Sequence, residues 1–395
     1  MWTRLVPQAC EADPPIRYGV IAIAALKRTS EAKHVSANWS KESTDEAQIY
    51  HQFAFKVYGK AIREMQNTIM TGKQDLRTAL ITSLVITCFE SFHGAHESAV
   101  KQIRIGISLL EDHLTDKLLF QADSPSIENE IIQVFGRLEI QAMAFSQTRS
   151  PEGHFKMKDF GQNSIESMPQ KFETFRDAEF YFEIVVQRLL HHMTSLVNVD
   201  CSGRLKQDND LFIPKEHMLT RETHLITLRK WHDAFKPLLK TARTSSCSET
   251  FIGASSMQLV YLTTYFSAAV IRDSSQAYAD TRKFMPLFTQ MVSLARSILE
   301  HPSHEKTGNS SFSFEMQAVN PLYNVARRCP HRGLRHEAIS LLLSYPRREG
   351  LWDSIFAGKF AEWVSMLEEE ICDEEFVPDH LRCRGVDILE CNMMT

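Results

Sequence analysis

A short segment of this 395-residue chain gathers acidic, basic and metal-binding side chains at close spacing. Residues 90–97 read Glu-Ser-Phe-His-Gly-Ala-His-Glu, and their chemically active members are Glu90, His93 and His96. On a helix, Glu90 and His93 share one face, as carboxylate–imidazole metal sites and acid–base pairs require. We expect Gly94 to end that helix, which takes His96 out of this geometry. The alternative is a corner between two helices, where these side chains cap exposed backbone groups.

A second candidate is a group of basic residues towards the C-terminal end. This group could bind a phosphate, another anion or an acidic protein. The alternative, which we prefer, is that its side chains form ion pairs with Glu349, Asp353 and the acidic run 368–370. The members of this basic cluster are Arg328, Arg332, Arg335, Arg347 and Arg348.

The remaining motifs give little support for a catalytic or metal site. The sequence contains no nucleotide-binding glycine loop, no G-x-S-x-G and no H-E-x-x-H. His191 and His192 are adjacent, so on a helix they point about 100° apart and cannot chelate together; we expect them to carry charge at a helix end. Cys88 lies in an apolar run and is expected in the core, and no C-x-x-C pair occurs. We therefore assign no metal and no cofactor. The 24 Phe and 15 Met residues could line a hydrophobic pocket or simply fill the core.

Helical periodicity surrounds these candidates. Between residues 47 and 70, apolar side chains recur at the i, i+3, i+4 spacing of an amphipathic helix. Gly72 and Asp75 then predict the end of one helix and the start of the next, so these two helices should form an antiparallel pair. At least ten such segments, with only 15 Gly and 14 Pro, predict an all-α fold. We expect a multi-helix array of antiparallel pairs, arranged as one large or two packed helical lobes.

Polar stretches divide the predicted helices. Residues 29–44 are interpreted as a loop, and residues 146–171 as a long loop or lobe boundary. This places an N-terminal lobe at residues 1–145, a C-terminal lobe at 172–371 and a tail at 372–395.

Charge and hydropathy exclude several classes of protein. Lys and Arg total 44 against 49 Asp and Glu, and the net charge of −5 argues against direct nucleic-acid binding through bulk charge. No apolar run approaches the ~20 residues of a membrane span, and the N-terminus lacks a signal-peptide pattern. We expect no membrane association and an intracellular location, nuclear or cytoplasmic.

A specific residue pattern lies in the C-terminal third. It comprises Pro321-Leu322-Tyr323, Arg328-Cys329, Pro346-Arg347-Arg348-Glu349-Gly350 and Trp352-Asp353. The pattern resembles the C-terminal part of the regulatory region of fungal zinc binuclear cluster transcription factors. Weaker matches, such as Phe135-Gly136-Arg137-Leu138, extend the resemblance over about residues 7–370. That family reads DNA with six cysteines that hold two zinc ions in an N-terminal module. This chain has no such module, so DNA binding is not carried over.

The resemblance implies a transcription-regulator-like helical protein without its own DNA-binding module, in fungal (secondary) metabolism. It would act through a protein partner or a small hydrophobic ligand, and a homodimer is compatible with this role. The alternative is a recruited biosynthetic enzyme, with acid–base catalysis on a polyketide- or terpenoid-like substrate in a pocket between helices. Under that alternative, Glu90, His93 and His96 are the candidate catalytic residues. A third interpretation places a zinc-cluster module in an upstream exon.

Overall fold

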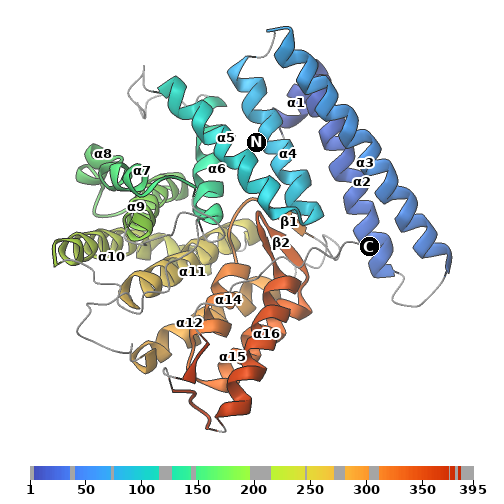
Figure 1. The fold of residues 1–395 in the computed structure, drawn as a ribbon. Helices are drawn as coiled ribbons and strands as arrows, with labels where there is room; N and C mark the ends of the chain where they lie inside the picture. Colours follow the sequence, from blue (N-terminus) through green and yellow to red (C-terminus); the bar gives the residue numbers. More distant parts are fainter. Residues whose placement is uncertain are drawn as a thin grey trace.

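The computed structural model describes residues 4–35, 41–72, 75–114, 127–143, 148–195, 215–244, 247–270, 281–301, 311–372, 374–378 and 381–383. Within these ranges the protein is an all-α array of packed helices, as the periodicity predicted (Figure 1). No convincing strand alternation occurs in the sequence, yet three short strands form a small sheet.

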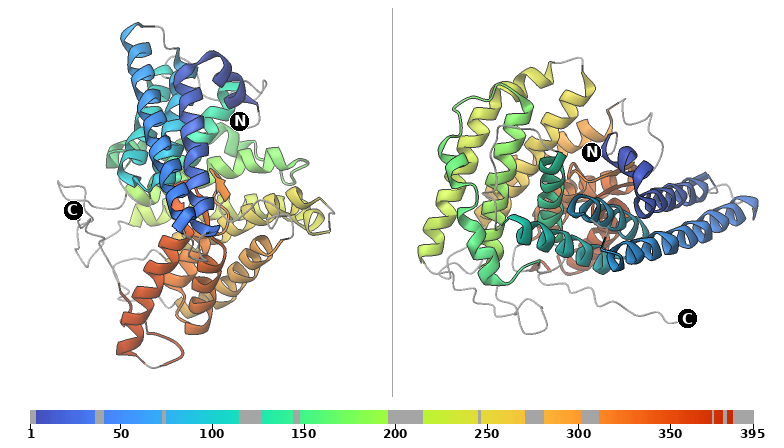
Figure 2. Two further views of the ribbon diagram at one scale, coloured as in Figure 1. Left: turned by 90° about the vertical axis from the view of Figure 1, so that its right-hand side faces the viewer. Right: turned by 90° about the horizontal axis from the view of Figure 1, so that it is seen from above.

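Six helices lie in the described part of residues 1–145, which is called the N-terminal lobe below. α2 and α3 are the longest of them and lie side by side along one flank of the molecule (Figures 1 and 2). The sequence predicted α3 to pair with α4. Instead, α3 packs mainly along α2, while α4 packs against α2 and α5. These helices are α1 (Leu5–Ala12), α2 (Pro14–Val35), α3 (Lys41–Met70), α4 (Leu76–His93), α5 (His96–Leu114) and α6 (Ile127–Ala142).

Helix α4 is enclosed on all sides, since every residue from Leu80 to Phe89 is buried. Enclosure explains why its sequence is a continuous apolar run rather than a stripe. Both ends fall where the sequence predicted them: Asp75 accepts a hydrogen bond from the amide of Thr78, and Gly94 ends the helix at φ +95°. Even this helix is too short or too polar to cross a bilayer, as is every other helix in the described ranges.

The C-terminal lobe has an aromatic centre at Trp231. The indole Nε1 donates to the carbonyl of Ala178 at 2.8 Å, and the rings of Phe182 and Phe235 stack on it. This lobe contains α9 (Phe175–Ser195), α10 (Lys215–Arg243), α11 (Ser248–Val270), η3 (Thr281–Phe284), α12 (Met285–Leu299), α14 (Val319–Arg328), α15 (Arg332–Ser344) and α16 (Ser354–Ile371).

Two predicted loops are partly helical. The described part of residues 146–171 contains α7 (Pro151–Lys156), η2 (Met157–Asp159) and α8 (Gln162–Glu166), which pack on α9. Ser150 accepts a hydrogen bond from the amide of Gly153, and a proline in the first turn completes this helix start. Likewise α2 continues to Val35 and α3 already begins at Lys41, so the loop predicted at 29–44 is much shorter.

The small sheet joins the two lobes at a tight turn. Gly350, at φ +58°, forms this turn, and its amide donates to the carbonyl of Ser313 at 2.6 Å. The hydroxyl of Ser91 in α4 donates to the Gly350 carbonyl. The Gln141 amide in α6 donates to the Phe314 carbonyl at 2.8 Å and accepts from the amide of Leu351 at 3.0 Å. The strands are β1 (Ser311–Ser313), parallel to β2 (Arg347–Glu349), and β3 (Trp352–Asp353), antiparallel to β2.

Candidate functional site

The structure brings two groups of sequence-predicted residues to one cavity. This cavity of about 270 Å³, called the junction cavity below, is lined by His93 from α4 and by Arg347 and Arg348 from β2. His51 from α3 and Asp353 from β3 are its other titratable lining residues. Side chains that are more than 250 residues apart in sequence therefore meet where the lobes join.

Ion pairs within the protein balance the charges of the junction cavity. Arg348 pairs with Asp353 at 2.8 Å and also donates to the carbonyl of Ser91. Arg347 pairs with Glu349 at 3.0 Å, and the Glu349 side chain is fully buried. No surplus positive charge is therefore left to attract an anion.

Glu90, His93 and His96 do not converge on a common point. Gly94 separates α4 from α5, so His96 starts a new helix. The carboxylate of Glu90 accepts a hydrogen bond from the hydroxyl of Tyr58. Burial lowers the pKa of both His93 and His96. In the part of the chain that is described, no group of three or more His, Cys, Asp and Glu is placed to hold a metal. The arrangement matches the interpretation as a corner between helices.

The rest of the basic cluster lies apart from the junction cavity. Arg335 forms an ion pair with Glu368 at 2.7 Å, and both side chains are fully buried. The backbone amide of Arg332 donates to the carbonyl of Glu375, and the carbonyl of Arg328 accepts from Arg382. The five arginines thus belong to two regions and not to one binding patch.

A larger cavity lies at the seam between the lobes, and sequence analysis singled out none of the residues around it as a site. It measures about 440 Å³ and is lined by α5, α6, α9 and residues 149–160. This seam cavity is mostly apolar, with eight large apolar residues in its lining: Ile107, Leu110, Ile132, Phe135, Met157, Phe160, Phe180 and Ile184.

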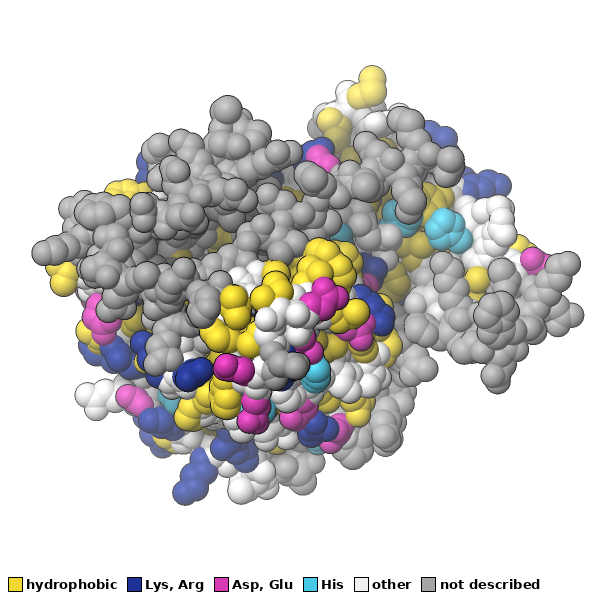
Figure 3. Space-filling model, turned by 60° about the horizontal axis from the view of Figure 1, so that its bottom comes forward, with side chains coloured by type: hydrophobic (Ala, Val, Ile, Leu, Met, Phe, Trp, Pro, Cys, Tyr) yellow, Lys and Arg dark blue, Asp and Glu magenta, His cyan; other side chains and the backbone are white. Residues whose placement is uncertain are grey.

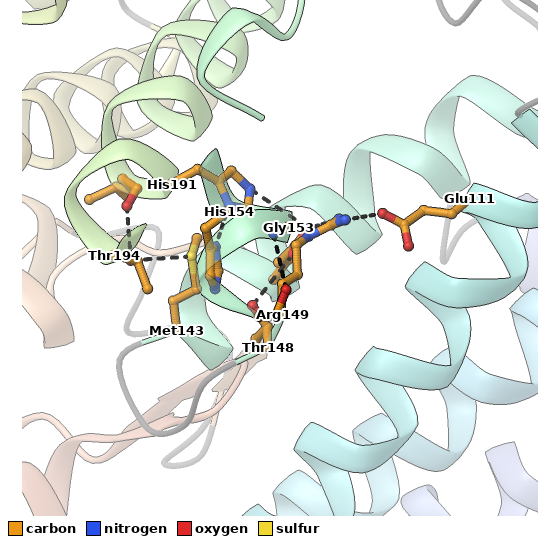
Figure 4. Close-up of polar contacts among 11 residues, drawn as sticks. Glu111, Met143, Thr148, Arg149, Gly153, His154, His191 and Thr194 are labelled. Carbon is orange, nitrogen blue, oxygen red and sulfur yellow. Dashed lines mark hydrogen bonds and ion pairs between the residues drawn. The ribbon is translucent and has the colours of Figure 1, made fainter. Parts of the chain in front are cut away.

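Arg149 organises the polar end of the seam cavity. Its guanidinium binds the carboxylate of Glu139 through two nitrogens, with a distance of 2.9 Å between Nη2 and Oε2. The same guanidinium also binds Glu111 (Figure 4). Because the Glu139 side chain is only 6% exposed, this two-point ion pair is well shielded from water. It fixes the segment after α6 against both α5 and α6.

A buried histidine pair lies behind this ion pair. The Nδ1 atoms of His154 in α7 and His191 in α9 are 2.8 Å apart, so one ring donates and the other accepts (Figure 4). His191 Nε2 lies 3.9 Å from a Glu139 oxygen. Burial, with the neighbouring ring of His191, lowers the pKa of His154 to about 4; burial, with Arg149, lowers that of His191 to about 3. Both rings are therefore neutral at pH 7. His191 and His192 lie near the C-terminal end of α9, as predicted, but both are buried, and the lowered pKa of His191 contradicts a charged role for that residue.

We expect acid to destabilise the protein through these histidines. The pKa of His224 is also lowered to about 3, by burial and then by His192 and Arg188. An unfolded histidine titrates near ~6.5, so the unfolded chain takes up protons first and stability falls as the pH drops below that value. Glu183, with a raised pKa of about 7, opposes this loss of stability on acidification. Its contribution favours the folded state at low pH and is lost as the pH rises towards 7. We expect a net loss of about 2–4 kcal/mol between pH 7 and 5.

Urea unfolding followed by circular dichroism at both pH values measures this loss. His224→Gln should reduce the difference between pH 7 and 5 by roughly half, since each buried imidazole contributes about 2 kcal/mol and Glu183 offsets part of their sum. Equal unfolding free energies at the two pH values in the unmodified protein would contradict the assignment.

Glu183 is the carboxyl group in the seam cavity whose ionisation is most perturbed. Burial raises its pKa to about 7, while Arg137 opposes the rise and Glu179 adds to it. The Arg137 Nε lies 2.5 Å from a Glu183 oxygen. A carboxyl that titrates near neutrality beside an apolar cavity has the properties of a general acid or base.

Little in the sequence marks the seam cavity, because its polar residues lie on separate elements. Glu139 is on α6, Arg149 precedes α7 and Glu183 is on α9. Two partial signals existed: the adjacent pair His191 and His192, and the weak family match at residues 135–138, which ends one residue before Glu139. Neither spacing nor residue type alone shows that these groups meet.

Comparisons with models of known protein families, with curated proteins and with solved structures found no match for this chain. The site is therefore interpreted from its own geometry. The segment that carries the resemblance to fungal regulators includes the joint between the lobes. There, Glu349 accepts hydrogen bonds from the backbone amides that start α14, and Asp353 accepts one from the amide of Phe356 at the start of α16.

Proposed function

We propose that this chain is a ligand-responsive regulatory module that binds a small, largely apolar molecule in the seam cavity. Together with the resemblance of residues 321–363, this favours a role as a transcription-regulator-like protein of fungal secondary metabolism. The observation that carries the proposal is the seam cavity itself, with apolar walls and one well-ordered polar end.

The size and position of the seam cavity support binding and signalling together. A volume of about 440 Å³ lies in the range of small-molecule sites, which are mostly apolar with a few placed polar groups. Its walls come from α5 and α6 of one lobe and α9 of the other. A ligand that contacts both lobes favours one arrangement of them over others, which is what a regulatory response requires.

An exposed apolar face on α16 supports action through a protein partner. Figure 3 shows the bottom of the molecule, where apolar side chains gather among charged ones. Among the exposed apolar residues of α16 are Phe356, Trp363 and Met366, which are about half exposed. Clustered apolar exposure of this kind is typical of interaction surfaces.

A neutral fluorescent probe and two matched glycine variants test binding in the seam cavity. N-phenyl-1-naphthylamine should bind saturably, with a rise in fluorescence. Gly136→Leu places a side chain where the movable amide of Gln187 now lies, 2.2 Å from the new Cβ, so it should fill the cavity and weaken binding at least about tenfold. Gly59→Leu on α3 meets open space away from the cavity and should leave affinity unchanged. Equal affinity in all variants, or no binding at all, would contradict the proposal.

The perturbed carboxyl of Glu183 favours an enzyme as the second candidate function. In that case the seam cavity holds a substrate, and Glu183 transfers a proton to or from it. Deletion of the gene with metabolite profiling separates the two candidates. Loss of all products of a pathway together supports regulation, whereas accumulation of one intermediate, reproduced by Glu183→Gln, supports catalysis.

A further inference from the structure

A second cavity lies on the other side of Glu183 from the seam cavity. It measures about 380 Å³ and lies between α9 and α11, with contributions from α6 and from the residues after β1. Glu183 lines both cavities. We call this one the acidic cavity, because four of its lining residues are glutamates: Glu179, Glu183, Glu249 and Glu315.

The acidic cavity has a marked excess of negative charge. Among the described residues of its lining, Arg137 is the only basic one. This one guanidinium pairs with Glu183 at 2.5 Å, with Glu179 at 3.1 Å and with Glu315 at 3.5 Å. Glu249, on α11, has no part in this network. The lining therefore holds four carboxyl groups against one guanidinium, and a second cation placed among them would gain attraction from several at once.

The titration of Glu183 agrees with this excess. Burial raises its pKa to about 7 even though Arg137 lies in direct contact, and the neighbouring carboxylates Glu179 and Glu315 add to the rise. The charged groups that face Glu183 from other elements are Arg137 on α6, Glu315 after β1 and, across the seam cavity, Arg149 with Glu111 and Glu139. A bound cation would favour the ionised form of Glu183.

An unpartnered polar side chain also faces the acidic cavity. Ser256 is 8% exposed and lines the cavity, and its hydroxyl has no hydrogen-bond partner among the described residues. Buried hydroxyl groups are normally paired, so this one is available to a ligand. The rest of the lining suits the apolar body of an organic cation, because the side chains of Phe175, Phe182 and Met257 offer an apolar surface that excludes water.

We propose that the acidic cavity binds an organic cation, namely an apolar body that carries one protonated amine. The ammonium would lie among Glu179, Glu249 and the Ser256 hydroxyl, and the apolar body against Phe175 and Phe182. A neutral molecule of the same shape gains only the apolar contacts, and an anion is repelled. This inference goes beyond the proposed function, since it concerns a separate site and holds whether or not the seam cavity is occupied.

Three probes of matched shape test the charge preference by calorimetry at pH 7.5. They are 4-phenylbutylamine, 4-phenylbutan-1-ol and 4-phenylbutanoate. We expect the amine to bind at least about tenfold more tightly than the alcohol, and the carboxylate to show no binding. Equal affinities of amine and alcohol would overturn the proposal, as would the absence of amine binding.

Variants of the cavity wall locate the bound amine. Glu179→Gln and Glu249→Gln should each weaken amine binding about three- to tenfold and leave alcohol binding unchanged. Glu173→Gln removes an equal charge from an exposed side chain outside the cavity and should leave amine affinity unchanged. Gly253→Leu should abolish amine binding, because an added Cβ there meets open space in the cavity wall and the helix is not strained.

Gly136→Leu separates this site from the seam cavity. It should leave amine affinity unchanged, whatever its effect on the neutral probe N-phenyl-1-naphthylamine. Loss of amine binding in Gly136→Leu but not in Gly253→Leu would place the amine in the seam cavity and overturn the proposal. Melting temperatures of the glycine variants, measured by circular dichroism, verify that each is folded.

Discussion

Replacing Gly350 by alanine is expected to destabilise the folded protein by about 3 kcal/mol or more. Gly350 has φ +58°, a region that L-residues other than glycine adopt only with strain. An added Cβ would lie 1.9 Å from the Gln141 side-chain oxygen. That oxygen cannot simply move away, because Gln141 is buried and holds both Leu351 and Phe314 by hydrogen bonds. The substitution therefore breaks the contact between α6 and the small sheet.

A second glycine separates backbone strain from collision. Gly72 has φ +64°, and nothing lies within 4 Å of a Cβ placed there. Gly72→Ala should therefore cost only the backbone term, about 1 kcal/mol. Urea unfolding by circular dichroism gives both values. If Gly350→Ala costs no more than Gly72→Ala, the turn at Gly350 is not the joint between the lobes that the structure indicates.

Much of the fold could be predicted because helices are specified by residues that are close together in sequence. The apolar stripe of α3, the cap at Asp75 and the stop at Gly94 depend on neighbours within one or two turns. The helices missed between residues 148 and 166 are short and weakly periodic, so their stability comes from packing on α9. Even there, Ser150 followed by Pro151 is a pattern typical of the start of a helix.

The candidate sites were much harder to predict, since cavities arise where elements distant in sequence meet. Arg137 belongs to a weak family match, but its three carboxylate partners come from α9 and from the residues after β1. The basic cluster illustrates the converse. Arg335, Arg347 and Arg348 are close in sequence, yet ion pairs direct them to different places. The sign of a side chain's charge can be read from the sequence, whereas the residue with which that side chain forms an ion pair cannot.

Glu349→Ala should be the other strongly destabilising substitution, with an expected cost of about 3–5 kcal/mol. The Glu349 side chain is fully buried and accepts hydrogen bonds from the amides of Gln317, Ala318 and Val319 at 2.8 to 3.0 Å. These amides start α14 and have no other helix partners, so the carboxylate serves as their cap. It also balances the charge of Arg347 at 3.0 Å. Alanine would leave three donors, two of them buried, and a shielded guanidinium without this acceptor.

A matched pair of controls shows whether burial is the cause. Glu337→Ala also removes an ion pair, with Arg296 at 2.8 Å, but that pair is more than a third exposed and its loss should cost at most about 0.5 kcal/mol. Glu349→Gln keeps an oxygen acceptor without the charge and should fall between the two alanine variants. Hydrogen exchange should accelerate at the amides of Ala318 and Val319 in Glu349→Ala alone. Similar unfolding free energies for Glu349→Ala and Glu337→Ala would refute the capping role. The expected difference would instead give a physical reason why Arg347, Glu349 and Gly350 are close in sequence. Glu349 caps α14, Arg347 balances the charge of that cap, and Gly350 turns the chain between the lobes.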